Sequence, residues 1–366
     1  MLNSNSILIL FLSILILNIL FFPKPCMDGC LKGLKLFVFS LFPSLFPFLV
    51  ICNLIIHFNG AQIYGNLLGP LLCRPLGLPL NCSVVLILSF LCGYPMGAKY
   101  TCDLYTEGLL DYKTSEKLLN IASNASPLFI LGTVAINMMN NKNVGYILLF
   151  SNYASCFIMG LLMKEKRHML TYNKTTSIHK NKTSSPPSFS KALSLSIDDA
   201  ITVVLKVAGF VIVFAIISEI IQSTSFFKNV CLTNTTSTTI TSFLLGILEI
   251  TNGCNNISLL NIPLFLKVGI LSFLISFSGI CIILQVYTFL FKYNFPIKKY
   301  IVRKLFQGII SGLLSIFIFF ITSQKESVLT LSTDPYGIRL SHMLFLSIIL
   351  FVLPFCISKI KSILYK

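Results

Sequence analysis

The sequence predicts an all-α membrane protein that crosses the bilayer many times. Of its 366 residues, 55% are hydrophobic and only 11% are charged, and the mean hydropathy is +0.85. A soluble globular domain carries about 25% charged residues, whereas a membrane-spanning helix needs about 20 mostly apolar residues. Apolar runs of about that length recur along the chain. Composition and run length therefore exclude a soluble domain.

About eight apolar runs are long enough to be crossings. The first follows a segment without Lys or Arg, and no small-residue cleavage site follows it. We therefore expect a retained span there and no secretory signal. The expected crossings are residues 7–22, 36–57, 118–139, 144–163, 201–221, 264–290, 305–321 and 343–357.

Two more apolar stretches, 84–98 and 240–260, do not fit as ordinary crossings, because each changes halfway into Gly, Pro or polar residues. Gly and Pro interrupt a helix, and irregular backbone at membrane depth is tolerated only where protein or a polar cavity covers it. We expect two re-entrant hairpins. Their predicted turn residues are Gly93, Tyr94, Pro95 and Gly97 in the first hairpin, and Gly246 and Gly253 in the second.

The surroundings of the two hairpins form an internal repeat. Asn124, in a polar break within an apolar run, follows Gly93 by 31 residues, and Ser276, in a similar break, follows Gly246 by 30. Such self-similarity is the signature of repeated structural units.

Each hairpin also follows a span that we expect to be broken, at Pro43 and Pro47 in one half and at Gly209 in the other. Because an odd number of crossings separates corresponding elements, the two hairpins enter from opposite sides. An inverted-topology repeat of this kind places a polar site near the bilayer midplane, where the broken helices meet.

One long polar segment, rich in Lys, Ser, Thr and Pro, reads as a flexible linker between the halves. The expected organisation is an N-terminal span (1–32), a first membrane repeat (33–163), a basic linker (164–192), a second membrane repeat (193–322) and a C-terminal span with a tail (323–366).

The charge of the chain is strongly positive, with 28 Lys and Arg against 12 Asp and Glu. Loops on the linker side carry 19 of these bases and loops on the other side carry 7, which predicts that both termini are cytoplasmic. We expect a multi-pass protein of the cell membrane whose basic loops face anionic lipid headgroups.

Because the bases lie in gaps between apolar runs, no nucleic-acid partner is expected. The sequence does not predict the oligomeric state.

The candidate residues for binding a solute or an ion are Glu249, Thr251, Asn252, Asn124, Ser126, Ser276 and Ser278. Glu249 is the most informative, because a carboxylate within an apolar stretch is costly unless it is paired, hydrated or functional. Either it binds a polyol, a ribose or a coupling cation, or it caps the free N–H groups of the broken helix. The other candidates either face a central cavity or pack between helices.

No pattern in the sequence indicates an enzyme. The four histidines lie far apart, and HExxH, GxSxG, Walker and GxGxxG motifs are absent. The twelve cysteines include no CxxC pair, so we expect packing residues and no zinc site. We therefore predict no catalytic residue, no metal and no cofactor.

The segments LFPSLFPFLV, CGYPMGAK with the following ASNASPLFILGTV, and GILEITNG resemble the sporulation integral membrane proteins of the YlbJ type, which carry paired nucleoside-recognition, or Gate, domains. The resemblance covers residues 33–290. It implies a protein of endospore-forming bacteria that is needed to form the spore cortex. The Gate domain is similar to the repeat unit of concentrative nucleoside transporters, whose hairpins meet around a substrate.

We therefore expect a non-enzymatic, transporter-like protein that acts in sporulation by moving or sensing a small polar solute, nucleoside-like or other. The alternative is a scaffold or assembly protein of the developing spore envelope that has kept the fold without transport, because a fold alone does not determine function.

Overall fold

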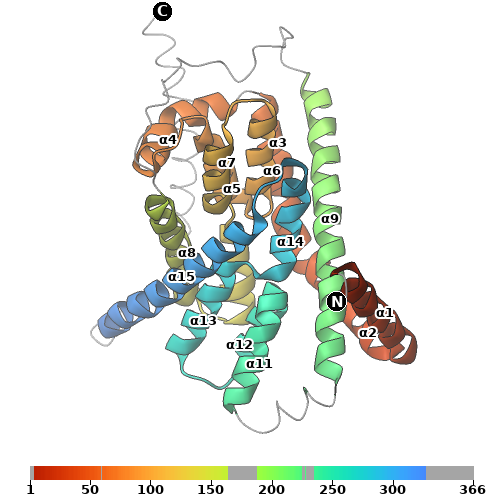
Figure 1. Ribbon diagram of the computed structural model, residues 1–366. Coiled ribbons are helices and arrows are strands. Elements are labelled where there is room, and N and C mark those ends of the chain that lie inside the picture. Colours follow the sequence, from red (N-terminus) through yellow and green to blue (C-terminus); the bar gives the residue numbers. More distant parts are fainter. Residues whose placement is uncertain (1–3, 59, 164–187, 225–226, 228–234, 327–366) are drawn as a thin grey trace, which may run out of the picture.

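The computed structural model describes residues 4–58, 60–163, 188–224, 227 and 235–326 (Figure 1). All regular structure in these ranges is helical, and four helices are long and apolar enough to cross a membrane. The expected all-α membrane class is therefore confirmed. The expected crossing at 343–357 and most of the 164–192 linker lie outside the described residues.

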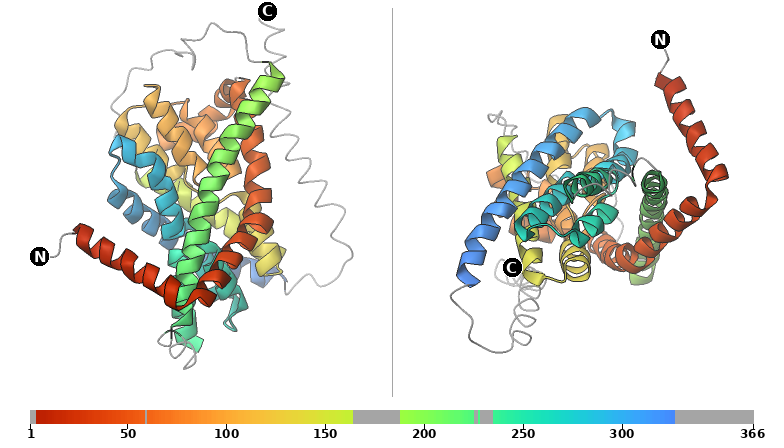
Figure 2. Two further views of the ribbon diagram at one scale, coloured as in Figure 1. Left: turned by 90° about the vertical axis from the view of Figure 1, so that its right-hand side faces the viewer. Right: turned by 90° about the horizontal axis from the view of Figure 1, so that it is seen from below.

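The N-terminal region consists of α1 (Ser4–Phe21) and α2 (Pro23–Leu36), whose axes differ by 103°. Proline favours the first turn of a helix, because its φ is fixed at a helical value and because N–H groups in the first turn have no partner within the helix. Proline at the start of α2 therefore begins a new helix there. Figure 2 shows α1 projecting away from the other helices. The segment 23–35, expected as a loop after the first crossing, is instead a helix that packs along α9 through Gly29 and Gly33.

The first half of the chain continues with short helices and one long one. They are η1 (Phe37–Leu41), α3 (Phe42–His57), α4 (Gly60–Leu76), α5 (Cys82–Cys92), α6 (Met96–Thr106), α7 (Tyr112–Ile121), η2 (Phe129–Met138) and α8 (Lys142–Leu162). The expected crossing at 118–139 is thus two helices, α7 and η2, separated by a non-helical segment that ends before Pro127. Proline disfavours helical backbone at the residue before it, so the break has a local cause.

The second half of the chain begins with a much longer helix. Its elements are α9 (Phe189–Ser223), α11 (Thr235–Leu248), α12 (Ile250–Leu259), α13 (Leu264–Phe277), α14 (Gly279–Leu290), η3 (Phe291–Tyr293) and α15 (Ile297–Glu326). The expected break of α9 at Gly209 is wrong, since this helix is continuous over 35 residues. A single glycine costs a helix only about 1 kcal/mol, which the flanking apolar turns compensate.

Apart from α4, which has no counterpart in the described residues of the second half, the order of elements is the same in both halves. A span (η1–α3 or α9) is followed by a hairpin (α5–α6 or α11–α12), a broken helix (α7–η2 or α13–α14) and a long helix (α8 or α15). Figure 1 shows α5, α6 and α7 in the upper half of the molecule and α11, α12 and α13 in the lower half. The two hairpins therefore approach the centre from opposite ends, as an inverted repeat requires.

Seven of the eight expected crossings fall within the described residues, and four of these seven contain an apolar helix long enough to cross a membrane. The four long apolar helices are Lys142–Leu162, Phe189–Ser223, Leu264–Tyr293 and Ile297–Thr322, and the bent α1–α2 pair is a fifth candidate. The helices at 45–57 and 129–138 are apolar but short. The difference arises because interrupted apolar runs form pairs of half-length helices.

Candidate functional site

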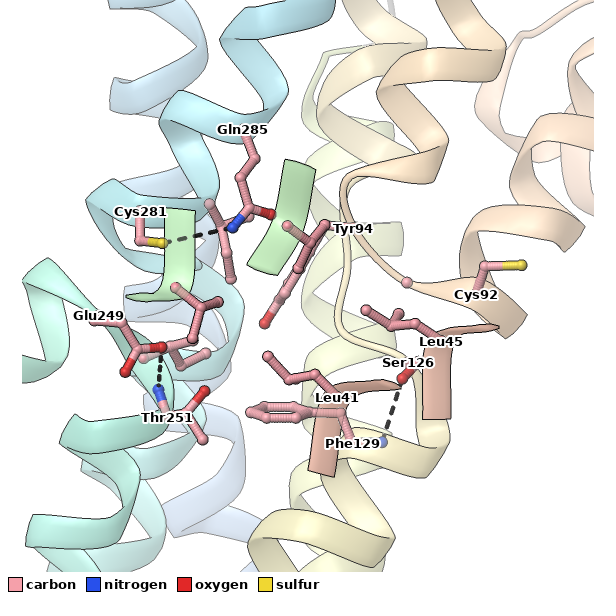
Figure 3. Close-up of a pocket in the computed structure, with 15 residues that line it drawn as sticks. Leu41, Leu45, Cys92, Tyr94, Ser126, Phe129, Glu249, Thr251, Cys281 and Gln285 are labelled. Atoms are coloured by element: carbon pink, nitrogen blue, oxygen red, sulfur yellow. Dashed lines mark hydrogen bonds between the residues drawn. The ribbon is translucent and has the colours of Figure 1, made fainter. Parts of the chain in front are cut away.

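The turns of the two hairpins meet at one small cavity in the middle of the molecule (Figure 3). Its volume is about 40 Å³, and its walls come from η1–α3, the α5–α6 turn, the α7–η2 break, α9, the α11–α12 turn and α14. The polar or sulfur-bearing side chains in its walls belong to Cys92, Tyr94, Ser126, Glu249, Thr251, Cys281 and Gln285. The two hairpins and the two broken helices, α7–η2 and α13–α14, therefore all contribute to or border this cavity.

The first hairpin turns at Gly93, which ends α5 with a φ of 77°. A Cβ atom at Gly93 would lie 2.7 Å from the Ser126 nitrogen, and one at Gly97 would collide with the Ala122 carbonyl. The Tyr94 N–H donates to the Asn124 carbonyl at 2.7 Å. These glycines allow the hairpin backbone to lie directly against the α7–η2 break. Pro95 is the residue before α6, so all four predicted turn residues lie at or beside this turn.

The second hairpin turns at Glu249, which has an extended backbone (φ −141°, ψ 118°) between α11 and α12. Its carboxylate accepts hydrogen bonds from the N–H groups of Thr251 (2.9 Å) and Asn252 (2.7 Å). Of the two roles left open for Glu249, capping of the broken helix is thus present in the structure. Capping does not exclude binding, because a carboxylate has about four acceptor positions and two are used here.

The expectation that Gly246 and Gly253 form the turn of the second hairpin is wrong. Gly246 lies in α11 and Gly253 in α12, and a Cβ atom on Gly253 would collide with the Gly246 backbone. The two glycines instead let the paired helices touch through their backbones. The turn falls on Glu249 because its side chain supplies the acceptors that the first N–H groups of α12 lack.

Glu249 is buried, with 1% of its surface exposed, and within the described residues it forms no ion pair. Its carboxyl oxygens instead face the N-terminus of α12, where the helix dipole is positive. Figure 3 shows the Tyr94 hydroxyl pointing into the space between Glu249 and Ser126. That hydroxyl is buried and has no hydrogen-bond partner among the described residues. An uncompensated donor beside a carboxylate is suited to a polar or charged ligand.

The other predicted residues divide between the cavity and the helix interfaces. Ser126 lines the cavity and accepts a hydrogen bond from the Phe129 N–H at 3.2 Å. Asn124 bonds to neighbouring helices, and the Ser276 hydroxyl donates to the Asn152 side chain at 2.9 Å. Ser278 has a left-handed backbone (φ 80°) at the α13–α14 break, and its buried hydroxyl has no partner in the described part of the chain.

Sequence reasoning missed a polar stripe on α15. Tyr300, Lys304, Gln307, Ser311 and Ser315 are all buried, although Lys304 was expected in a cytoplasmic loop. The signal was present in the sequence, since these residues are four, three, four and four positions apart. That spacing places them on one face of a helix. Within the described residues, no group of His, Cys, Asp or Glu is arranged to hold a metal ion.

Comparison with known proteins agrees with this architecture. A family model named Gate and described as nucleoside recognition matches residues 38–165. The chain is 27% identical, over 339 residues, to the sporulation integral membrane protein YlbJ of Bacillus subtilis (strain 168), covering 86% of this chain and 81% of that protein. No solved structure matches.

The resemblance expected from the sequence is therefore confirmed: the chain is an all-α membrane protein that carries a Gate, or nucleoside-recognition, segment and is similar to the sporulation protein YlbJ over most of its length.

Proposed function

We propose that this protein is a non-enzymatic, transporter-like protein of the cell membrane that moves or senses a small polar solute during sporulation and thereby supports formation of the spore cortex. The observation that carries the proposal is the meeting of two hairpin turns, which approach from opposite ends, at one mainly apolar cavity that contains the Glu249 carboxyl group and the Tyr94 hydroxyl. Inverted-repeat transporters have their site where such broken helices end. The similarity to YlbJ supports the role in sporulation, and the Gate match supports a nucleoside-like solute.

The size of the cavity determines what the described conformation can hold. One water molecule needs about 10–15 Å³ of such volume, so about 40 Å³ accommodates a few water molecules. Pockets that enclose small-molecule ligands measure about 300–1,000 Å³. A nucleoside-sized solute therefore requires one hairpin to move away from the other.

The second hairpin is better suited to this movement. The first hairpin is held by buried hydrogen bonds, from the Tyr94 N–H to the Asn124 carbonyl and from the Tyr100 hydroxyl to the Asn53 side chain (2.7 Å). Helices α11 and α12 contact each other closely through their glycines, so they can move as one body. Such a movement would carry Glu249 with it and open the cavity.

The small cavity also favours the alternative, a scaffold of the developing spore envelope that has kept the fold without transport. The replacement Glu249→Gln separates the two functions. Gln keeps one acceptor for the α12 N–H groups and removes the negative charge. We expect this variant to reach the membrane in normal amount but to give defective cortex in a spore-forming host that lacks its own copy.

The matched control is Glu107→Gln, which removes an exposed carboxylate at the end of α6 and should leave the cortex normal. If Glu249→Gln lowers the amount of protein, Glu249→Asn replaces it in the comparison, because Asn also removes the charge and is a strong N-cap. Normal cortex with Glu249→Gln protein in the membrane would exclude the transport function and leave the scaffold.

A further inference from the structure

A lysine is buried at the break of the first repeat. Lys304 lies on α15 with 1% of its surface exposed, and its ammonium group donates to the Ser123 carbonyl and to the Gln307 side-chain oxygen (3.0 Å). Within the described residues it forms no ion pair with a carboxylate. A buried ammonium is costly unless oxygen atoms replace its water. Its surroundings must therefore supply that compensation.

A chain of hydrogen bonds orients acceptors towards this ammonium group. The Ile121 carbonyl can only accept, so the side-chain NH₂ of Asn124, 2.6 Å away, donates to it. The Asn124 side-chain oxygen then accepts from the Gln307 NH₂ at 2.9 Å, which leaves the Gln307 oxygen facing Lys304. Each amide has one donor end and one acceptor end, so a single backbone carbonyl determines the orientation of both amides.

The C-terminal end of helix α7 also attracts the Lys304 ammonium group. Helix α7 ends at Ile121, and the last carbonyls of a helix have no partner within it and carry partial negative charge. The hydroxyl groups of Ser123 and Tyr300 are close to each other at the same point. The oxygens that contact the ammonium are thus a backbone carbonyl and a side-chain amide oxygen, without a carboxylate. Unwound backbone carbonyls and helix C-termini are the groups that bind Na⁺ in inverted-repeat transporters.

Among the described residues, the corresponding break in the second half has no such lysine. Gln307 corresponds to Asn152 on α8 (307 − 152 = 155), and Asn152 accepts from Ser276 at the α13–α14 break. At the same offset, Lys304 corresponds to Leu149 (304 − 149 = 155). The last helix of each half thus places an amide at the break of the other half. Only the first break receives a positive charge in this way.

We propose that the α7–η2 break is a monovalent-cation site that the chain occupies with its own Lys304 ammonium group. A tethered ammonium binds without loss of translational freedom, so the site takes up no Na⁺ or K⁺ from solution. It joins the two halves through α15 and the break. Removal of the side chain should therefore leave an oxygen-lined cavity that a free cation can enter.

The test measures thermal unfolding of the purified full-length protein in detergent, in NaCl, KCl or N-methylglucamine chloride at equal ionic strength. Lys304→Ala should unfold at lower temperature than wild type in N-methylglucamine, and Na⁺ or K⁺ at a few times its Kd should raise the midpoint by about 1–3 °C. Lys304→Met should lose stability without any recovery, because its side chain fills the cavity. The exposed Lys298→Ala on the same helix is the control and should behave as wild type.

Two results would overturn the proposal. One is a folded Lys304→Ala protein whose midpoint is the same in all three salts. The other is a cation-specific rise of the wild-type midpoint, which would show that the site is open to solution. The wild-type measurement requires no variant, so it decides the question even if Lys304→Ala fails to fold, and Lys304→Ser then takes the place of the Ala variant.

Discussion

The contact between Gly246 and Gly253 is the most exacting packing feature of the second hairpin. The change Gly253→Ala adds one methyl group, which would collide with the Cα of Gly246 and lie 2.7 Å from its nitrogen. Overpacking of this kind costs about 1–3 kcal/mol, and backbone atoms cannot rotate away. The gain in helix propensity from Gly to Ala is about 1 kcal/mol. The cost should lie at the upper end of its range, so we expect a net loss of about 1–2 kcal/mol.

Gly209 provides the matched control in the same chain. It lies within α9, and a Cβ atom there would meet nothing within 4 Å. Gly209→Ala should therefore gain up to about 1 kcal/mol from helix propensity alone. The two variants should differ by about 2–3 kcal/mol in opposite directions from wild type.

The assay is thermal unfolding of the purified full-length variants in one detergent, with the order Gly253→Ala, wild type, Gly209→Ala from lowest to highest midpoint. Gly246→Ala should also lower the midpoint, but by a different contact, because its Cβ atom would lie 2.6 Å from the Leu274 side chain on α13. A Gly253→Ala midpoint at or above that of wild type would refute the backbone contact. It would also remove the argument that α11 and α12 move as one body.

Two other predictions concern the first repeat and the topology. Asp111 caps α7 by accepting from the Thr114 N–H at 3.3 Å, so Asp111→Ala should lower the free energy of unfolding by about 0.5–2 kcal/mol. Asp111→Asn should restore this free energy. Equal unfolding midpoints for wild type, Asp111→Ala and Asp111→Asn would contradict the cap. In a background without native cysteines, single cysteines at Asn141 and Asn234 should react with an impermeant thiol reagent from outside, and one at Ser177 from inside. Labelling of Asn234 and Ser177 from the same side would contradict the inverted repeat.

Local chemistry was a good guide to where helices stop. The break at Gly93 was expected because glycine disturbs a helix through its own backbone, whereas residues 118–139 were expected as one crossing although Pro127 acts in a similar way. The break of the second hairpin was expected in the right stretch, but it falls on Glu249. Gly209 shows the limit of such reasoning, since a residue that permits a break does not require one.

Roles that depend on a partner far away in the chain could not be predicted in the same way. Gly246 and Gly253 resembled turn residues, but Gly253 is needed because the Gly246 backbone lies opposite it, and Gly246 because the Leu274 side chain does. Lys304 resembled a loop base, because nothing in its neighbourhood in the sequence shows that Ser123 lies beside it. The predicted site contained Glu249, Thr251 and Ser126, but Tyr94 was expected only as a turn residue and Gln285 was not expected at all.

The sequence by itself determined that this protein lies in a membrane, that it is helical, and that each half contains a hairpin. Those properties follow from apolar run length and from residues that act on their own backbone, so they do not depend on distant contacts. Only the tertiary structure decided which breaks face one another, that the Glu249 turn borders a cavity shared with the first hairpin, and that Lys304 lies at the end of α7. These outcomes depend on packing between segments more than 100 residues apart, as the 181 residues between Lys304 and Ser123 show. A pattern read along the chain does not show which distant segments pack together.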